Sequence, residues 1–111
     1  MANSIEDPEI RAIFLEAAEF QIQALKKGLS RLYQQPQDRE AAEAVHVAAH
    51  TLKGDASFVQ LTDIEQPAQE IDRAVRATAN GQTSMTQTQV IDLARKLDAI
   101  LQQVVSLQNH K

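Results

Sequence analysis

A histidine, a lysine and a glycine stand close together near the middle of the chain, in the stretch His50-Thr51-Leu52-Lys53-Gly54. Residues three and four positions apart lie on the same face of an α-helix, so Lys53 and Gly54 would both flank His50. This face would offer a nucleophilic ring nitrogen, a cation that binds phosphate oxygens, and a patch of backbone without a side chain. The combination suits a histidine that carries a phosphoryl group and lets another protein come close enough to take it.

The sequence predicts that the elements positioning this cluster are helices, and it predicts no strand. Alanine, glutamine and leucine dominate the 111 residues, while aromatic residues and glycine are scarce, which is typical of helix formers. We expect helices at about 7–34, 38–58, 62–80 and 86–108. Helices of this length joined by short loops favour an all-α, antiparallel up-down four-helix bundle that spans residues 1–111 as a single domain.

Signals for helix ends lie between the expected helices. Pro36 ends the first one. Pro67 falls inside the third, where its missing N–H and its ring predict a kink or a 3₁₀-like start. The other signals are N-caps at Asp38 and Thr86 (the latter with Gln89 three residues on), a capping box from Thr62 to Glu65, and a C-cap at Asn80-Gly81.

Apolar residues recur at helical spacing in every expected helix. In the second helix the inner side is mostly alanine and His50 lies on the opposite side, which predicts that His50 faces solvent. Ile13 and Phe20 lie off the stripe of the first helix, so we expect that helix to contact neighbours on two sides. The predicted core is Ile10, Phe14, Ala17, Ala18, Leu25, Leu29, Leu32, Ala41, Ala44, Val45, Ala48, Leu52, Ala56, Val59, Ile64, Ala68, Ile71, Ala74, Val75, Val90, Leu93, Ala94, Leu97, Leu101, Val104 and Leu107.

Composition excludes several classes of function. The net charge is −4 and basic residues are scattered, which argues against a nucleic-acid binder. No apolar run is long enough for a membrane span, and the absence of cysteine fits the cytoplasm. His46 and His50 lie one turn apart but lack an evident third ligand, so we expect no metal site. His110 has no evident role.

The histidine cluster resembles the H-x-L-K-G signature of histidine phosphotransfer (HPt) domains, with Ala56, Leu61 and Ile64 following it as in that family. The flanking stretches 13–19 and 48–54 are most similar to the N-terminal phosphoacceptor domain of chemotaxis-type histidine kinases. Three positions depart from these relatives. Asp55 stands where a small residue is usual, Gln60 where glycine is common, and His46 where chemotaxis-type relatives tend to have phenylalanine.

The resemblance implies a role for each residue of the site. His50 would be the phosphoacceptor through Nε2, Lys53 would offset the charge of the phosphoryl oxygens, and Gly54 would keep the surface open. The family often places a carboxylate or an amide on the third helix to accept a hydrogen bond from the other ring nitrogen, and that position here is Asp72, with Gln69 one turn earlier. Such an acceptor would fix the tautomer and raise the nucleophilicity of Nε2. A plain ion pair between Asp72 and Arg76 is an equally good interpretation.

The resemblance also implies partners. In such domains the histidine receives the phosphoryl group from a histidine kinase catalytic domain or from a phosphorylated receiver, and passes it to an aspartate of a response-regulator receiver domain. The domain would need no cofactor and no ATP site of its own, so we expect a monomeric phosphocarrier rather than an enzyme, standing alone or as the first domain of a larger kinase. The alternative is a helical module that docks receivers without carrying phosphate. Autonomous catalysis is disfavoured because no cysteine nucleophile, paired acid cluster or glycine-rich phosphate loop is present.

Overall fold

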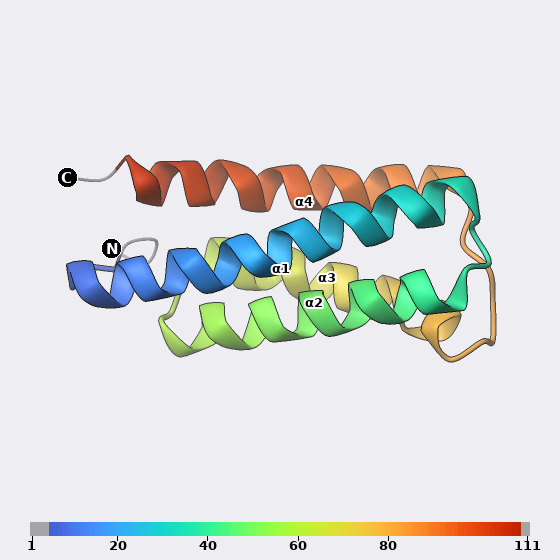
Figure 1. Ribbon diagram of the computed structural model, residues 1–111, viewed down its shortest axis with the longest axis horizontal. Helices are drawn as coiled ribbons and strands as arrows, with labels where there is room; N and C mark the ends of the chain where they lie inside the picture. Colours follow the sequence, from blue (N-terminus) through green and yellow to red (C-terminus); the bar gives the residue numbers. More distant parts are fainter. Residues whose placement is uncertain (1–4, 110–111) are drawn as a thin grey trace.

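Four helices account for most of residues 5–109, the part of the chain that the computed structural model describes (Figure 1). They are α1 (Pro8–Gln34), α2 (Arg39–Phe58), α3 (Thr62–Ala79) and α4 (Gln87–Gln108). No strand occurs among the described residues. The prediction of an all-α, antiparallel up-down four-helix bundle is confirmed, and each helix begins and ends within a single residue of its expected bounds.

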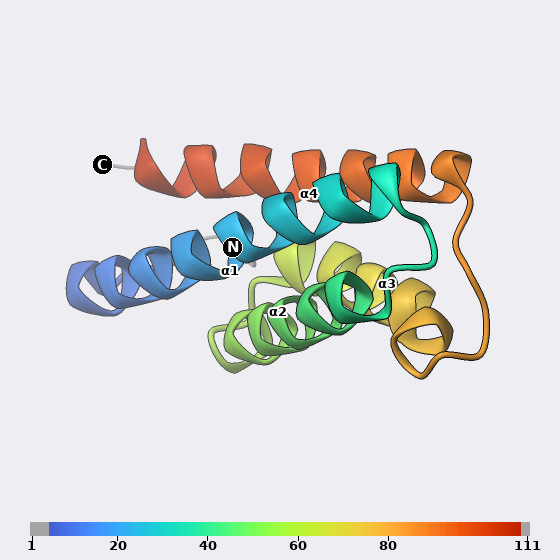
Figure 2. The ribbon, with the colours of Figure 1, turned by 45° about the vertical axis from the view of Figure 1, so that its right-hand side comes forward.

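The helices form a closed ring of neighbours. Each packs against the next along the chain, and α4 returns to pack against α1, so that α1 and α3 lie diagonally opposite (Figures 1 and 2). The bundle is 43 Å along its longest axis. The start of α1, the α2–α3 turn and the end of α4 share one end of the bundle (Figure 1). The closest association is between α2 and α3, and the histidine cluster lies on α2.

A single apolar core runs along the bundle, and most of the predicted core residues belong to it. Ile10, Ala44, Ala74 and Ala94 are wrong predictions, because these residues are exposed at the edges of their stripes. Helix α1 does contact neighbours on two sides, α2 and α4, as expected, but Ile13 and Phe20 themselves remain exposed. Buried apolar residues that the stripes omit are Ile5, Ile22, Ala42, Ala49, Leu61, Ala79, Met85 and Ile100. The stripes are therefore right in direction, but their width depends on how closely each neighbouring helix approaches.

Most of the helix ends follow the predicted signals. Asp38 accepts a hydrogen bond from the N–H of Ala41, and Thr86 and Gln89 form a reciprocal capping box. Gly81, with φ of 78°, ends α3 in a Schellman motif, in which Gln82 N–H donates to the carbonyl of Ala77.

The capping box expected at the start of α3 does not form. Thr62 is already the first helical residue, and the N-cap position belongs to Leu61, whose side chain caps nothing. Leu61 is buried in the core, and this packing sets the start of the helix one residue before the polar signal. Pro67 is accommodated within a continuous α-helix, so the expected 3₁₀-like start is also wrong.

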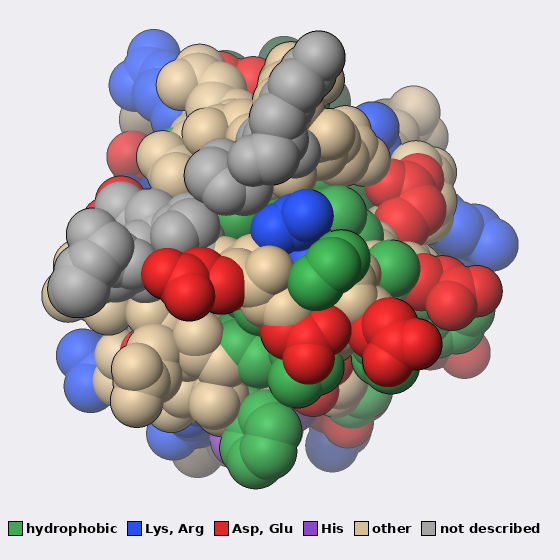
Figure 3. Space-filling model, turned by 90° about the vertical axis from the view of Figure 1, so that its left-hand side faces the viewer, with side chains coloured by type: hydrophobic (Ala, Val, Ile, Leu, Met, Phe, Trp, Pro, Cys, Tyr) green, Lys and Arg blue, Asp and Glu red, His purple; other side chains and the backbone are tan. Residues whose placement is uncertain are grey.

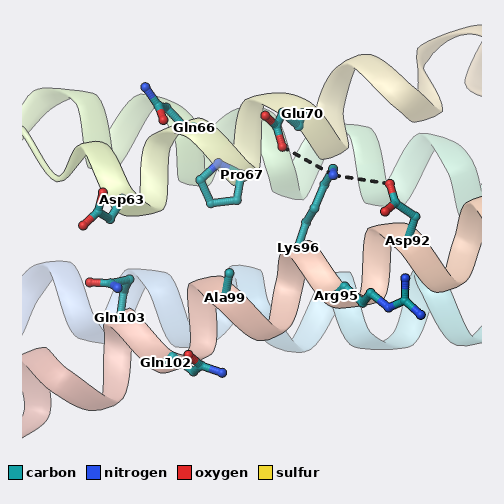
Figure 4. A pocket seen from close by; sticks show the side chains of 10 residues that line it. All are labelled: Asp63, Gln66, Pro67, Glu70, Asp92, Arg95, Lys96, Ala99, Gln102 and Gln103. Carbon is teal, nitrogen blue, oxygen red and sulfur yellow. Dashed lines mark ion pairs between the residues drawn. The ribbon is translucent and has the colours of Figure 1, made fainter.

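On its side facing α4, α3 also makes polar contacts. Pro67 lies in a cleft between the two helices, beside Lys96, whose ammonium group pairs with Glu70 at 3.5 Å and with Asp92 at 3.3 Å (Figure 4). These are surface ion pairs and contribute little to stability. Across residues 5–109, no helix combines the length and the apolar character needed to cross a membrane. His110 lies outside the described residues.

Candidate functional site

The histidine cluster lies where α2 packs along α3. The buried side of α2 is rich in alanine, which lets a neighbouring helix approach closely, and His46 and His50 follow one another by one turn beside this buried side. Asp72, on α3, points toward these two histidines. The site is therefore built from side chains on two rigid helices rather than on a loop.

Asp72 is the centre of the site. Its side chain is only 1% exposed, yet both carboxylate oxygens have partners. Oδ1 is in close hydrogen-bond contact with Nδ1 of His46. Oδ2 lies 3.4 Å from Nδ1 of His50 and accepts a hydrogen bond of 3.2 Å from Nη2 of Arg76. No buried side-chain nitrogen or oxygen among the described residues lacks a partner, so this carboxylate is buried with its hydrogen bonds made.

The surroundings of Asp72 favour its ionised form. Burial is the largest influence and by itself raises the pKa of the carboxyl group. The hydrogen bonds from His50 and His46, together with the positive charge of Arg76, outweigh burial and hold the pKa of Asp72 below its usual value. An ionised carboxylate accepts hydrogen bonds only, so the ring nitrogens that face it must be the donors.

His50 has the two properties expected of it from the sequence. Its side chain is 61% exposed, and its Nδ1 faces the carboxylate of Asp72. When Nδ1 carries the proton, Nε2 of a neutral ring keeps its lone pair and remains available to a reactant in solvent. Each interpretation of Asp72 has its contact in the structure, since the same oxygen lies near Nδ1 of His50 and pairs with Arg76, and the orienting role of Asp72 stays a prediction.

The remaining candidate residues differ in their burial and in their contacts. Lys53 is half-buried and makes no ion pair within the described part of the chain. A Cβ added at Gly54 would meet no atom within 4 Å, so this position is open space at the surface. Gln69 is half-buried and makes no side-chain hydrogen bond with any described residue, so the structure does not bring it to His50 as it does Asp72.

His46 is the residue that the sequence analysis missed. From the sequence alone, its one-turn spacing from His50 suggests only a metal pair, and its residue type departs from the chemotaxis-type relatives. In the structure its side chain is 28% exposed and is the closest contact of Asp72. The Nδ1 atoms of both histidines converge on one carboxylate, and among residues 5–109 no three His, Cys, Asp or Glu side chains are arranged so that they could hold a metal ion. The signal that could have revealed this role is the i, i+4 spacing itself, because both rings reach the same point of α3.

Exposed apolar side chains lie on α2, the helix that carries His50, and on the neighbouring α1. Val47 and Phe58 are exposed, Phe58 to 88%. The two helices enclose a shallow groove of about 300 Å³ near the end of α2, and Figure 3 shows hydrophobic side chains among acidic ones at this end of the bundle. The groove is lined by Ile10, Ile13, Phe14, Asp55, Phe58 and Val59.

A comparison with protein-family models assigns the chain to a family. The model described as Hpt domain matches residues 9–106, which covers nearly the whole bundle. Comparisons with curated proteins and with solved structures gave no match. Members of the matched family are phosphocarriers in two-component phosphorelays, where they interact with receiver domains and kinases. An exposed histidine held by a buried carboxylate on a four-helix bundle fits that activity, and the chain belongs to the Hpt domain family.

Proposed function

We propose that His50 is the phosphoacceptor of this phosphorelay module and that it passes the group to the aspartate of a response-regulator receiver domain. The observation that carries the proposal is that the ring of His50 faces solvent on one side and a buried carboxylate on the other. His50 is mostly exposed to solvent, while its Nδ1 faces a carboxylate that is almost completely buried. Nε2 is thereby left as the reactive atom.

In the proposed transfer, Nε2 attacks the phosphorus of a donor. The new P–N bond forms as the bond between phosphorus and the donor's leaving oxygen breaks, and the electron pair leaves with that oxygen. The ring is then substituted at Nε2 while Nδ1 keeps its proton, so it carries a positive charge that the carboxylate of Asp72 stabilises. Transfer to an aspartate runs through the reverse steps, with the carboxylate oxygen of the receiver attacking phosphorus and Nε2 leaving.

Lys53 and Gly54 have supporting roles in this proposal. Lys53 follows His50 by three residues on α2, and its ammonium group is not engaged by another described residue, so it is available to the phosphoryl oxygens. Gly54 leaves open space beside the ring, where the receiver's active site must approach. Phosphoryl transfer depends mostly on positioning and charge stabilisation, and the receiver supplies the remaining groups.

We infer that the module works as a cytoplasmic monomer between two kinds of partner. The donor is a histidine kinase catalytic domain, as in the chemotaxis-type proteins that the flanking sequence resembles, or a phosphorylated receiver. Val47 and Phe58 are exposed on the helix that carries His50 and give a docking receiver apolar contact. Neither partner requires the chain to bind ATP.

The test is phosphorylation of the chain by a histidine kinase and ATP, followed by measurement of phosphate that is labile in acid and stable in alkali. We expect the wild type to be labelled and His50→Gln to remain unlabelled with an unchanged circular dichroism spectrum, because the side chain is exposed. Equal labelling of the two proteins would exclude His50. Receiver binding that survives His50→Ala, without labelling of the wild type, would instead favour a docking module that carries no phosphate.

A further inference from the structure

Three described side chains donate hydrogen bonds to Asp72, and they differ in burial. His46 is 28% exposed, whereas Arg76 is 56% exposed and His50 is more exposed still. They also differ in which oxygen they contact. His46 holds Oδ1, while His50 and Arg76 share Oδ2. His46 is thus the most sheltered of the three donors and has one oxygen to itself.

Sharing makes the contact of His50 easy to lose. Arg76 lies closer to Oδ2, at 3.2 Å, than His50 does, at 3.4 Å. A guanidinium group binds a carboxylate best through two parallel hydrogen bonds, one to each oxygen. If Oδ1 were free, Asp72 could turn both oxygens to Arg76, which lies one turn further along the same helix, and Oδ2 would leave His50. Contact of His46 with Oδ1 prevents that rearrangement.

We propose that His46 is a positioning residue for the phosphoacceptor: by holding Oδ1 of Asp72 it keeps Oδ2 directed at Nδ1 of His50. His46 does not touch the reacting atoms in this scheme. It acts through the carboxylate, which selects the tautomer of His50 whose Nε2 is free to attack. The consequence for transfer rests on the proposed role of His50, whereas the effect on the ring's tautomer does not.

Two substitutions at position 46 separate the hydrogen bond from the packing. His46→Phe keeps a flat ring without a donor. His46→Asn places an amide N–H₂ at the same number of bonds from the backbone as Nδ1, so it restores a donor to Oδ1. Glu43→Gln is the matched control, because Glu43 is an exposed residue one turn earlier on α2 with no contact to Asp72.

The first readout is the tautomer of His50, measured from the ¹⁵N chemical shifts and couplings of its ring at a pH where the ring is neutral. We expect the Nδ1–H tautomer to predominate in the wild type, in Glu43→Gln and in His46→Asn, and to lose that predominance in His46→Phe. An unchanged tautomer population in His46→Phe would overturn the proposal. If His46→Phe does not fold by circular dichroism, His46→Leu provides the same comparison.

The second readout is the rate of phosphorylation by phosphoramidate, a small donor that needs no partner protein. Its P–N bond breaks as the bond to Nε2 forms, and ammonia leaves after taking a proton from water. We expect His46→Phe to react about tenfold more slowly. This is the lower end of the loss of activity seen when a metal-ligating histidine loses the hydrogen-bond partner of its other ring nitrogen. We expect His46→Asn to recover most of the rate. Equal rates in all variants would refute the positioning role. If the wild type is not labelled while His46→Phe still changes the tautomer, the proposed function fails and the positioning role stands.

Discussion

Two glycines lie inside helices, and alanine is expected to stabilise the protein at one position and not at the other. At Gly54, on α2, a new Cβ would meet nothing within 4 Å. At Gly28, on α1, it would lie 2.5 Å from Cγ2 of Val45 and 3.3 Å from the carbonyl oxygen of Ala41. Gly28 is therefore a point of close approach between α1 and α2, and Gly54 is a gap in the surface.

The magnitudes follow from two competing effects. Replacing glycine by alanine inside a helix stabilises it by about 1 kcal/mol, and at Gly54 no other effect opposes this gain. At Gly28 the methyl group meets Val45, which is fully buried and stiff because it is β-branched. Overpacking of this kind costs roughly 1–3 kcal/mol, which exceeds or cancels the gain. We therefore expect Gly28→Ala to be less stable than Gly54→Ala by roughly 1–3 kcal/mol.

The assay is urea unfolding of the wild type and both variants, followed by circular dichroism at 222 nm in one buffer. Val45→Ala provides the control background, because it removes the Cγ2 atom that Gly28→Ala would meet. In that background Gly28→Ala should stop being unfavourable, so the double-mutant cycle should show a favourable coupling. Equal stability of Gly28→Ala and Gly54→Ala, or the absence of coupling to Val45, would refute the reasoning.

The remaining predictions concern the site and one turn. Lys53→Ala should slow phosphoryl transfer without abolishing it, because the lysine offsets charge but does not react; single-turnover rates with a receiver test this, and complete loss would contradict it. Gly54→Leu should leave labelling of His50 by phosphoramidate intact and slow transfer to a receiver, so equal receiver rates would contradict an open docking surface. Because the pKa of Asp72 is depressed in the folded state, its ionisation stabilises the fold above its unfolded pKa and that contribution is lost as pH falls through its lower folded pKa. Asp72→Asn should therefore lose less stability than the wild type as pH falls below about 4 in urea titrations, and parallel acid curves would exclude this. Gln60 has φ of 63°, so Gln60→Gly should raise the free energy of unfolding by about 1 kcal/mol, and an unchanged urea midpoint would speak against strain at this turn.

The fold was predictable because the chain marks its own helix ends. Asp38, Thr86 and Gly81 act locally, through hydrogen bonds to backbone groups a few residues away, and such signals can be read without knowing the neighbours. Thr62 is the exception that shows the limit. Burial of Leu61 sets the start of α3, and burial depends on the whole bundle. Gly28 was overlooked for the same reason, since its role lies in the contact with a residue of another helix.

The site was predictable only as far as one helix determines it. The helical period places His46 and His50 on one face of α2, and the exposure of His50 follows from that face alone. Which residue of α3 they meet depends on how the two helices slide along one another, and a sequence does not state that offset. The family resemblance supplied Asp72. It could not supply the contact with His46, because the chemotaxis-type relatives tend to carry phenylalanine there.

Under the proposed function, burial of Asp72 would resolve a conflict between two requirements of an exposed phosphoacceptor. Nε2 must be open to large partners, yet a ring that is open on all sides would exchange tautomers freely with water. A surface carboxylate would be screened by solvent, whereas a buried one makes stronger hydrogen bonds because the local dielectric is low. Burying a lone carboxylate would be costly, and here three donors offset that cost. His46 and His50 lie on the same helix and both donate to Asp72. If His50 is the acceptor, the contact of His46 with Asp72 keeps one side of the His50 ring rigid while the other side stays open.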